Sequence, residues 1–124
     1  MRWLWVFLGG GIGSVLRYLV GGWVQGAAGT AFPWGTFVVN ASGCFAIGVL
    51  ATWLTERSAP APELGTFLLV GVLGGYTTFS SFGIETFRLL EAAAWLHAAG
   101  NALGSMAAGL AGVTAGVLLA RSVP

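Results

Sequence analysis

The residues most capable of chemistry lie together in Gly74–Phe82, which reads GGYTTFSSF within a strongly apolar stretch. Two adjacent glycines are followed by four threonine and serine hydroxyls and by two phenylalanines three residues apart. In hydrocarbon every backbone polar group needs an internal partner, so a helix-weakening cluster is tolerated only inside protein or along a cavity. We therefore expect the functional site in this segment.

A break in the helix here would free backbone oxygens. If the turn Gly74–Thr77 is non-helical, carbonyls normally used by the helix become available, and unwound carbonyls are ligands that membrane proteins offer to alkali cations. A sodium-like ion is the natural candidate. A simple kink whose backbone groups bond to the threonine hydroxyls is the alternative.

Phe79 and Phe82 share one helix face, a spacing that by itself is typical of packing. An aromatic ring also has a positive edge, and ring edges with hydroxyl and amide donors can replace the water around a small anion. Asn40, within another apolar stretch, is such an amide, although an interhelical hydrogen bond would also explain it. Asn101 and Ser105 lie one turn apart and could face the same region.

The composition defines the class of protein. The chain has 124 residues, of which 56% are hydrophobic and 7% charged, whereas soluble domains have about 25% charged residues. Residues 32–55 carry no charge, and residues 92–120 contain His97 as their one ionisable group. Each stretch exceeds the roughly 20 residues that cross a bilayer. We expect an all-α integral membrane protein with a single transmembrane domain over residues 1–124.

Hydropathy and turn residues predict four helices, of which the third is broken at mid-span. Their expected bounds are 3–24, 33–55, 64–91 and 95–120. Arg2 and the apolar residues after it resemble the start of a signal peptide, but Gly9–Gly13 and Arg17 interrupt the apolar run. We therefore expect a retained first helix.

The arginines give almost no preferred orientation, and the chain has no lysine. Arg2, Arg57 and Arg121 fall on one side of the membrane, while Arg17 and Arg88 lie towards the other. Insertion in both orientations and a small protein with one fixed topology remain equally compatible with this pattern.

Small residues spaced four apart predict helices that pack closely, without showing against which partner. The pairs are Gly9 and Gly13, Gly100 and Gly104, and Gly112 and Gly116. Four helices enclose little space, so a polar conduit is more easily built at a dimer interface. We therefore expect an oligomer.

Other function classes lack their residues. His97 and Cys44 are the single histidine and cysteine, and the sequence has neither a phosphate-binding glycine motif nor a nucleophile with a base. We expect no enzyme activity and, with a net charge of +1, no nucleic-acid partner.

Two charged residues of the third segment, Glu85 and Arg88, are spaced to pair near the membrane boundary. Arg17 either snorkels to the interface or attracts anions at a pore mouth.

Three motifs resemble the CrcB/Fluc family of fluoride channels. They are GGGIGSVLRY at 9–18, GTFVVNASGCFAIG at 35–48 and GVLGGYTTFSSFGIET at 71–86. The resemblance implies a fluoride-selective channel that is an antiparallel, dual-topology homodimer with two pores and a central structural sodium ion. Balanced charge then indicates dual insertion, and close glycine packing indicates a dimer.

The resemblance also implies roles for individual residues. The carbonyls of Gly74 and Thr77 would bind sodium, the ring edges of Phe79 and Phe82 would face fluoride, and Asn40 would line the pore as an amide donor. The resemblance further places Thr78, Ser81 and Ser105 in a polar track, with Glu85 just beyond it. Arg17 matches the family's arginine of the first helix, and its role stays open. Tyr76 and Ser81 depart from the residues most frequent at those positions.

The implied activity is passive efflux of fluoride through the cell (plasma or inner) membrane, with fluoride, the bilayer and a second copy as partners. Neutral HF enters cells and dissociates in a less acidic cytoplasm, which traps fluoride that needs an exit.

Two rival functions remain. A small multidrug-type, proton-coupled exporter needs a carboxylate in the first helix, which this chain lacks. For a non-transporting assembly subunit, the glycine packing would be explanation enough.

Overall fold

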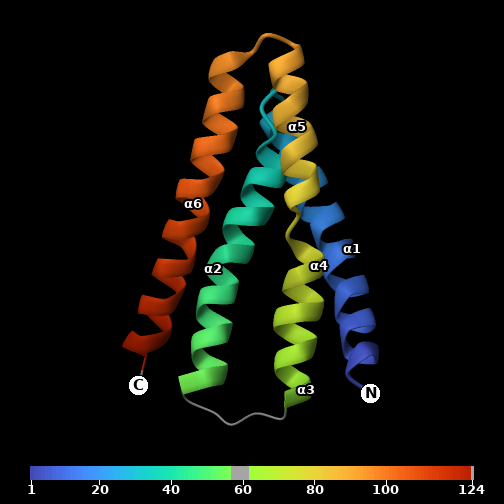
Figure 1. Ribbon diagram of the computed structural model, residues 1–124, viewed down its shortest axis with the longest axis vertical. Coiled ribbons are helices and arrows are strands. Elements are labelled where there is room, and N and C mark those ends of the chain that lie inside the picture. Colours follow the sequence, from blue (N-terminus) through green and yellow to red (C-terminus); the bar gives the residue numbers. More distant parts are fainter. Residues whose placement is uncertain (57–61, 124) are drawn as a thin grey trace.

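The computed structural model describes residues 1–56 and 62–123, and every regular element in those ranges is a helix (Figure 1). Arg57, which the charge pattern includes, and residues 57–61 between the expected second and third helices lie outside the described residues. The elements in chain order are α1 (Arg2–Ala28), α2 (Trp34–Glu56), α3 (Pro62–Gly65), the π-helix η1 (Thr66–Leu73), α4 (Gly74–Tyr76), α5 (Phe79–Glu91) and α6 (Trp95–Ser122).

Within the described ranges, four segments are long and apolar enough to cross a membrane. They are Arg2–Ala28, Trp34–Glu56, Pro62–Glu91 and Trp95–Ser122. The predicted class, an all-helical membrane protein, is confirmed. The two termini lie at the same end of the molecule, as four crossings require (Figure 1). Large apolar side chains cover much of the surface of the single chain, as expected for helices that face lipid or another copy.

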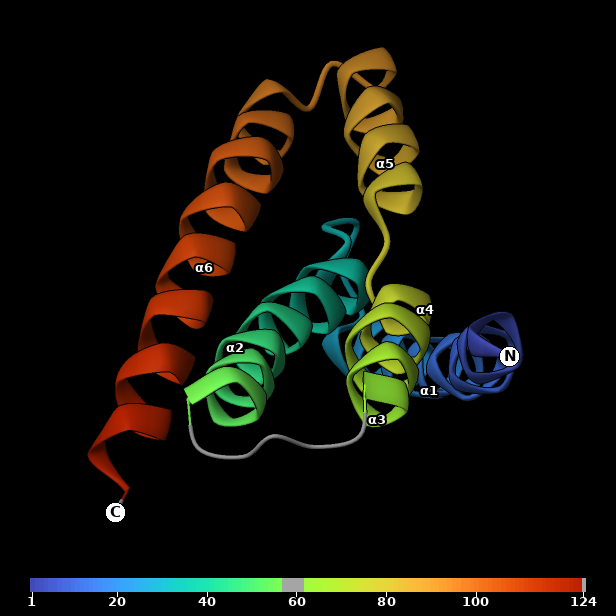
Figure 2. The same cartoon turned by 60° about the horizontal axis from the view of Figure 1, so that its bottom comes forward.

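The helices are arranged around the third segment. α2 packs along α6, and α1 packs along η1 and α4. α5 leaves α1 and contacts α6 instead. In both views α1 and α6 lie on opposite sides of α2 and α4 (Figures 1 and 2). The junction between α4 and α5 lies beside α2, which bonds it through Asn40 and Ser42.

Two residues of the third segment have extended backbone. Thr77 has φ −81° and ψ 156°, and Thr78 has φ −150° and ψ 118°. Figure 2 shows this stretch as a thread between α4 and α5. Gly74 is helical, with φ −63° and ψ −36°, so within the turn expected at Gly74–Thr77 the extended backbone begins at Thr77. Gly75 instead allows a close contact with α1, since a Cβ there would lie 2.5 Å from Gly10 O.

The helix ends have local explanations. Ala93 has φ 55°, and the amides of Ala94 and Ala93 donate to Leu89 O and Leu90 O, a pattern that satisfies the last carbonyls of α5.

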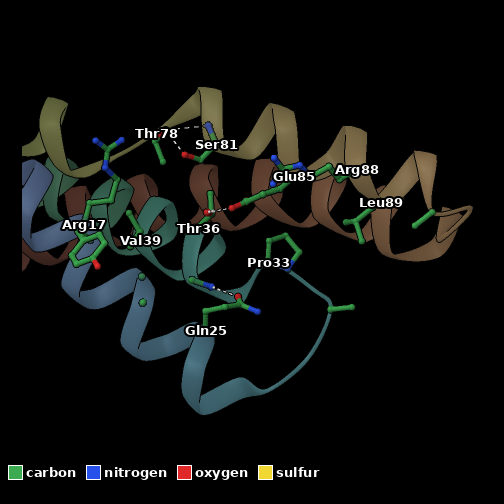
Figure 3. Close-up of a pocket in the computed structure, with 16 residues that line it drawn as sticks. Arg17, Gln25, Pro33, Thr36, Val39, Thr78, Ser81, Glu85, Arg88 and Leu89 are labelled. Carbon is green, nitrogen blue, oxygen red and sulfur yellow. Dashed lines mark hydrogen bonds between the residues drawn. The ribbon is translucent and has the colours of Figure 1, made fainter.

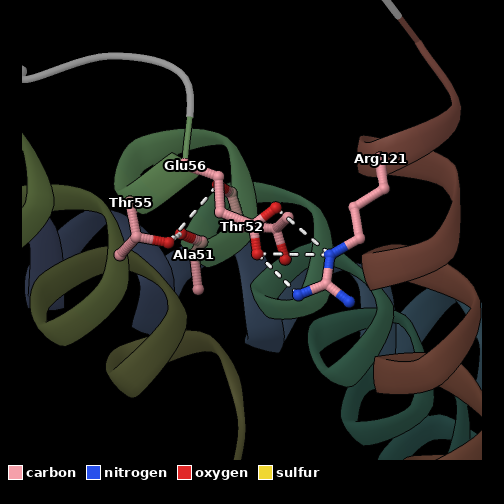
Figure 4. Close-up of polar contacts among 5 residues, drawn as sticks. All are labelled: Ala51, Thr52, Thr55, Glu56 and Arg121. Atoms are coloured by element: carbon pink, nitrogen blue, oxygen red, sulfur yellow. Dashed lines mark hydrogen bonds and ion pairs between the residues drawn. The ribbon is translucent and has the colours of Figure 1, made fainter.

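An ion pair joins α6 to α2 at the end of the molecule where both termini lie. Arg121 Nη2 lies 2.6 Å from Glu56 Oε1, and Arg121 Nε donates to the same carboxylate (Figure 4).

The glycine pairs pack within the chain. A Cβ at Gly9 or Gly13 would overlap the backbone of η1, and one at Gly116 would overlap the backbone of α2. Gly112 is also close to α2, with Ala41 O 3.0 Å from a Cβ built there. These contacts belong to neighbouring helices of one subunit, so the packing of these four glycines is explained without a second copy, and the dimer stays a prediction. Gly100 and Gly104 have only ordinary contacts with Phe32 and Phe37.

Gly13→Ala is expected to destabilise the chain by about 1–3 kcal/mol, since the added methyl meets backbone atoms that cannot rotate away. Gly11→Ala, on the same helix with nothing within 4 Å of its Cβ, should be neutral or stabilise by up to about 1 kcal/mol. Thermal unfolding of the purified protein in detergent compares them. Equal melting temperatures for the two variants would contradict the close contact between α1 and η1.

Candidate functional site

Asn40 of α2 pairs with both backbone groups of Thr78. The Asn40 Nδ2 amide donates to Thr78 O at 2.9 Å, and the Thr78 amide donates to Asn40 Oδ1 at 2.8 Å. A carboxamide has the donor and the acceptor that this double contact requires. Thr78 is 8% exposed, so its backbone could not rely on water for these bonds. The extended residue is therefore bonded to α2 in place of its own helix.

This pairing diverts amides from the carbonyls that would receive them in an α-helix. The Thr78 amide, which would bond Gly74 O, donates to Asn40. The Ser81 amide, which would bond Thr77 O, donates to the Thr78 hydroxyl at 3.2 Å and so caps α5. Gly74 O and Thr77 O, the two oxygens assigned to a cation by resemblance, thus lack their usual helical donors.

Seven of the predicted site residues line a hollow of about 410 Å³, here called the phenylalanine hollow. They are Asn40, Gly74, Thr77, Thr78, Phe79, Phe82 and Ser105. The rings of Phe79 and Phe82 lie with centroids 5.4 Å apart and planes tilted by 37°. Phe79 is 83% exposed in the single chain, so one side of this hollow is open.

The other predicted residues line a second hollow of about 610 Å³, here called the arginine hollow (Figure 3). Arg17, Ser81 and Glu85 lie there, together with Thr36 and Arg88. Thr78 lines both hollows. Of the residues expected along the fluoride path, Ser81 alone lines only the arginine hollow, beside Arg17 and Glu85, which were expected at or beyond its mouth. The two sets of residues meet at the extended backbone.

Glu85 is bonded to α2. The Thr36 hydroxyl donates to Glu85 Oε1 at 2.7 Å, while Glu85 Oε2 is buried and has no hydrogen-bond partner among the described residues. The expected pair with Arg88 does not form an ion pair in the described part of the chain. Thr36, on the neighbouring helix, thus bonds one oxygen of Glu85, and the other oxygen is buried without a hydrogen-bond partner among the described residues.

Ser105 is connected to α5 through Asn101. The Ser105 hydroxyl donates to Asn101 Oδ1 at 3.3 Å, and Asn101 Nδ2 donates to Thr86 Oγ1 at 2.8 Å. Thr86 in turn donates to Phe82 O at 2.7 Å. Asn101 is 1% exposed, so this chain of bonds is internal. It fixes the face of α6 that carries Ser105 against the part of α5 that carries the phenylalanines.

Sequence reasoning missed Thr36, Thr86 and the hydroxyl pair of Ser42 and Tyr76, whose oxygens are 2.9 Å apart. Thr36 precedes Asn40 by four residues, so the two side chains share one helix face. This spacing could have indicated Thr36 as a site residue. The partners of Thr86 and Tyr76 come from other helices. No spacing within the sequence indicates such pairs.

The fold and the two hollows define a small four-helix membrane protein with a polar site on its third segment. Residues 4–117 match the family described as CrcB-like protein, Camphor Resistance (CrcB). The chain belongs to this family, which confirms the resemblance found in the three motifs.

Similar proteins cover almost the whole chain. The fluoride-specific ion channel FluC of Solibacter usitatus (strain Ellin6076) is 52% identical over 122 residues, which are 98% of this chain and 99% of that protein. The protein of the same name from Rhizobium meliloti (strain 1021) is 45% identical over 97% of this chain and 96% of its own length. Fluoride-specific ion channel FluC 2 of Nocardia farcinica (strain IFM 10152) is 49% identical over 94% of this chain and 82% of its own.

Thr36→Val is expected to destabilise the protein by about 1–3 kcal/mol, because it removes the one hydrogen bond of the Glu85 carboxylate within the described chain. Thr36→Ser keeps the hydroxyl and should remain close to the wild type. Melting temperatures in detergent at neutral pH make the comparison. If valine and serine variants unfold together, the hydroxyl does not support Glu85.

Proposed function

We propose that this protein is a fluoride-selective channel, not an enzyme, that lets fluoride leave the cell passively through the cell membrane. The observation that carries the proposal is the phenylalanine hollow, where Phe79 and Phe82 lie beside the neutral donors Asn40 and Thr78. The fluoride-specific channels to which the chain is 45–52% identical support the same conclusion.

The lining of the hollow fits a small, strongly hydrated anion. Ring edges, an amide and hydroxyls can replace hydrating water while leaving no fixed positive charge to hold the ion. The two arginines, Arg17 and Arg88, line the other hollow. We assign them to attracting anions from solution, with Glu85 and Ser81 beside them, and assign the neutral donors, Ser105 among them, to the passage itself.

A structural sodium ion belongs to this proposal. Gly74 O and Thr77 O have lost their helical donors, and neutral backbone oxygens are suitable ligands for an alkali cation. Two carbonyls are too few for one ion, so a second subunit would contribute the same pair. Such an ion would hold the two subunits together at the dimer centre and would not travel with fluoride.

The second subunit is proposed to be antiparallel. Phe79 is 83% exposed, and a copy of the chain would cover that open side of the phenylalanine hollow. Arginines near both ends, such as Arg2 and Arg88, let the chain insert either way. An antiparallel pair would have two equivalent pores. Because HF enters cells uncharged and dissociates inside, passive efflux down the electrochemical gradient suffices for protection.

Liposomes with the purified protein should release fluoride at a rate that does not change when a proton gradient is imposed, and should release far less chloride. Phe82→Ile should reduce fluoride release to near the background of empty liposomes while the protein stays a dimer, since an aliphatic side chain has no positive edge. An ion-selective electrode records release, and gel filtration records assembly.

Phe87→Ile provides the matched control, because Phe87 is 54% exposed on the same helix and lines neither hollow. It should leave fluoride release near the wild-type rate. Release that depends on a proton gradient would indicate the exporter, and no release from the wild type would indicate an assembly subunit.

Dual topology predicts that about half of the molecules expose the C-terminal end outside the cell. A variant with Cys44→Ser and Ser122→Cys carries one exposed thiol at that end. A membrane-impermeant maleimide added to intact cells should label about half of what it labels after the cells are opened. Labelling of all or none of the protein in intact cells would exclude antiparallel insertion.

A further inference from the structure

The turn Asn40–Gly43 of α2 contacts each residue at the junction of α4 and α5. Asn40 pairs with Thr78, and the Ser42 and Tyr76 hydroxyls lie 2.9 Å apart. Gly43 faces Thr77 so closely that a Cβ at this glycine would overlap the threonine methyl. One helical turn of α2 thus fixes three successive residues of the third segment.

Without this support the third segment would have an alternative conformation. The Thr78 amide could donate to Gly74 O and the Ser81 amide to Thr77 O, as in a regular α-helix. The third segment would then be one continuous helix through the junction. In a low-dielectric environment an unpaired backbone group is costly, so removing the outside partner favours that closure. Closure would cover the same two oxygens that the proposed cation needs.

We infer that Asn40 is a positioning residue for the cation site: with the Thr78 hydroxyl, it holds the backbone open and keeps Gly74 O and Thr77 O available. This inference rests on the proposed function. It gives the Asn40 amide a second task besides its place beside the anion path, because the Nδ2 and Oδ1 atoms that bond Thr78 act on the backbone. Loss of Asn40 would then weaken sodium binding even in the absence of fluoride.

The test measures sodium binding by thermal stability. Purified dimer in fluoride-free detergent solution is melted as sodium chloride replaces N-methylglucamine chloride at constant ionic strength. The wild type should be stabilised with a defined sodium midpoint. Asn40→Leu, which keeps a similar volume and removes both bonds, should raise that midpoint by about tenfold or more.

Asn101→Leu is the matched control. Asn101 is likewise a buried amide between helices, but it bonds Thr86 and does not touch the junction. Its replacement should lower the melting temperature and leave the sodium midpoint at the wild-type value. If Asn40→Leu also keeps the wild-type midpoint, Asn40 acts only towards the anion and the inference is overturned.

A second pair of variants decides the matter if Asn40→Leu does not fold. Thr78→Val removes the oxygen that receives the Ser81 amide, and Thr78→Ser keeps it. The valine variant should raise the sodium midpoint and the serine variant should not; equal midpoints would overturn the inference. If sodium does not stabilise even the wild type, both the proposed cation site and this inference are overturned. Fluoride release from liposomes would still test the channel proposal independently.

Discussion

The double hydrogen bond between the Asn40 amide and the Thr78 backbone is the contact on which the rest of the site depends. Two extended residues inside an apolar segment leave amides and carbonyls that lipid cannot satisfy. Each such group, left unpaired, would cost several kcal/mol in hydrocarbon. α2 supplies a donor and an acceptor from one side chain, so the third segment can leave the helical path and still remain paired.

Close helix packing makes that contact geometrically possible. α1 approaches η1 and α4 through glycines, and Gly43 lets Thr77 lie directly on α2. A Cβ at Gly43 would overlap Thr77 and so push the junction away from α2, which carries the Asn40 amide. These glycines set the spacing of the helices around the third segment, while the extended backbone itself is made of threonines.

The sequence was informative where one residue type dominates the physics. Long apolar runs predicted the helices, and the cluster of glycines and hydroxyls predicted the part of the third segment where the regular helix is interrupted. The partners across helices were not predictable in this way. Asn40 could have bonded any group on the facing helices, and Glu85 was assigned to Arg88 because both lie on one helix, whereas Thr36 lies nearer in space. Resemblance named the site residues, but their division between two hollows required the fold.

That division has an electrostatic consequence. Charge–charge attraction grows steeply as the surroundings become less polar, so an arginine inside a narrow apolar passage would bind an anion strongly and slow its release. Arg17 and Arg88 line the arginine hollow, and Phe79 and Phe82 line the other. Thr78 lies in both. In the proposed channel, an anion attracted by the arginine hollow would reach the neutral donors by passing the extended backbone. Under the proposed function, the extended backbone would therefore offer its carbonyls to the cation and the Thr78 hydroxyl to the anion.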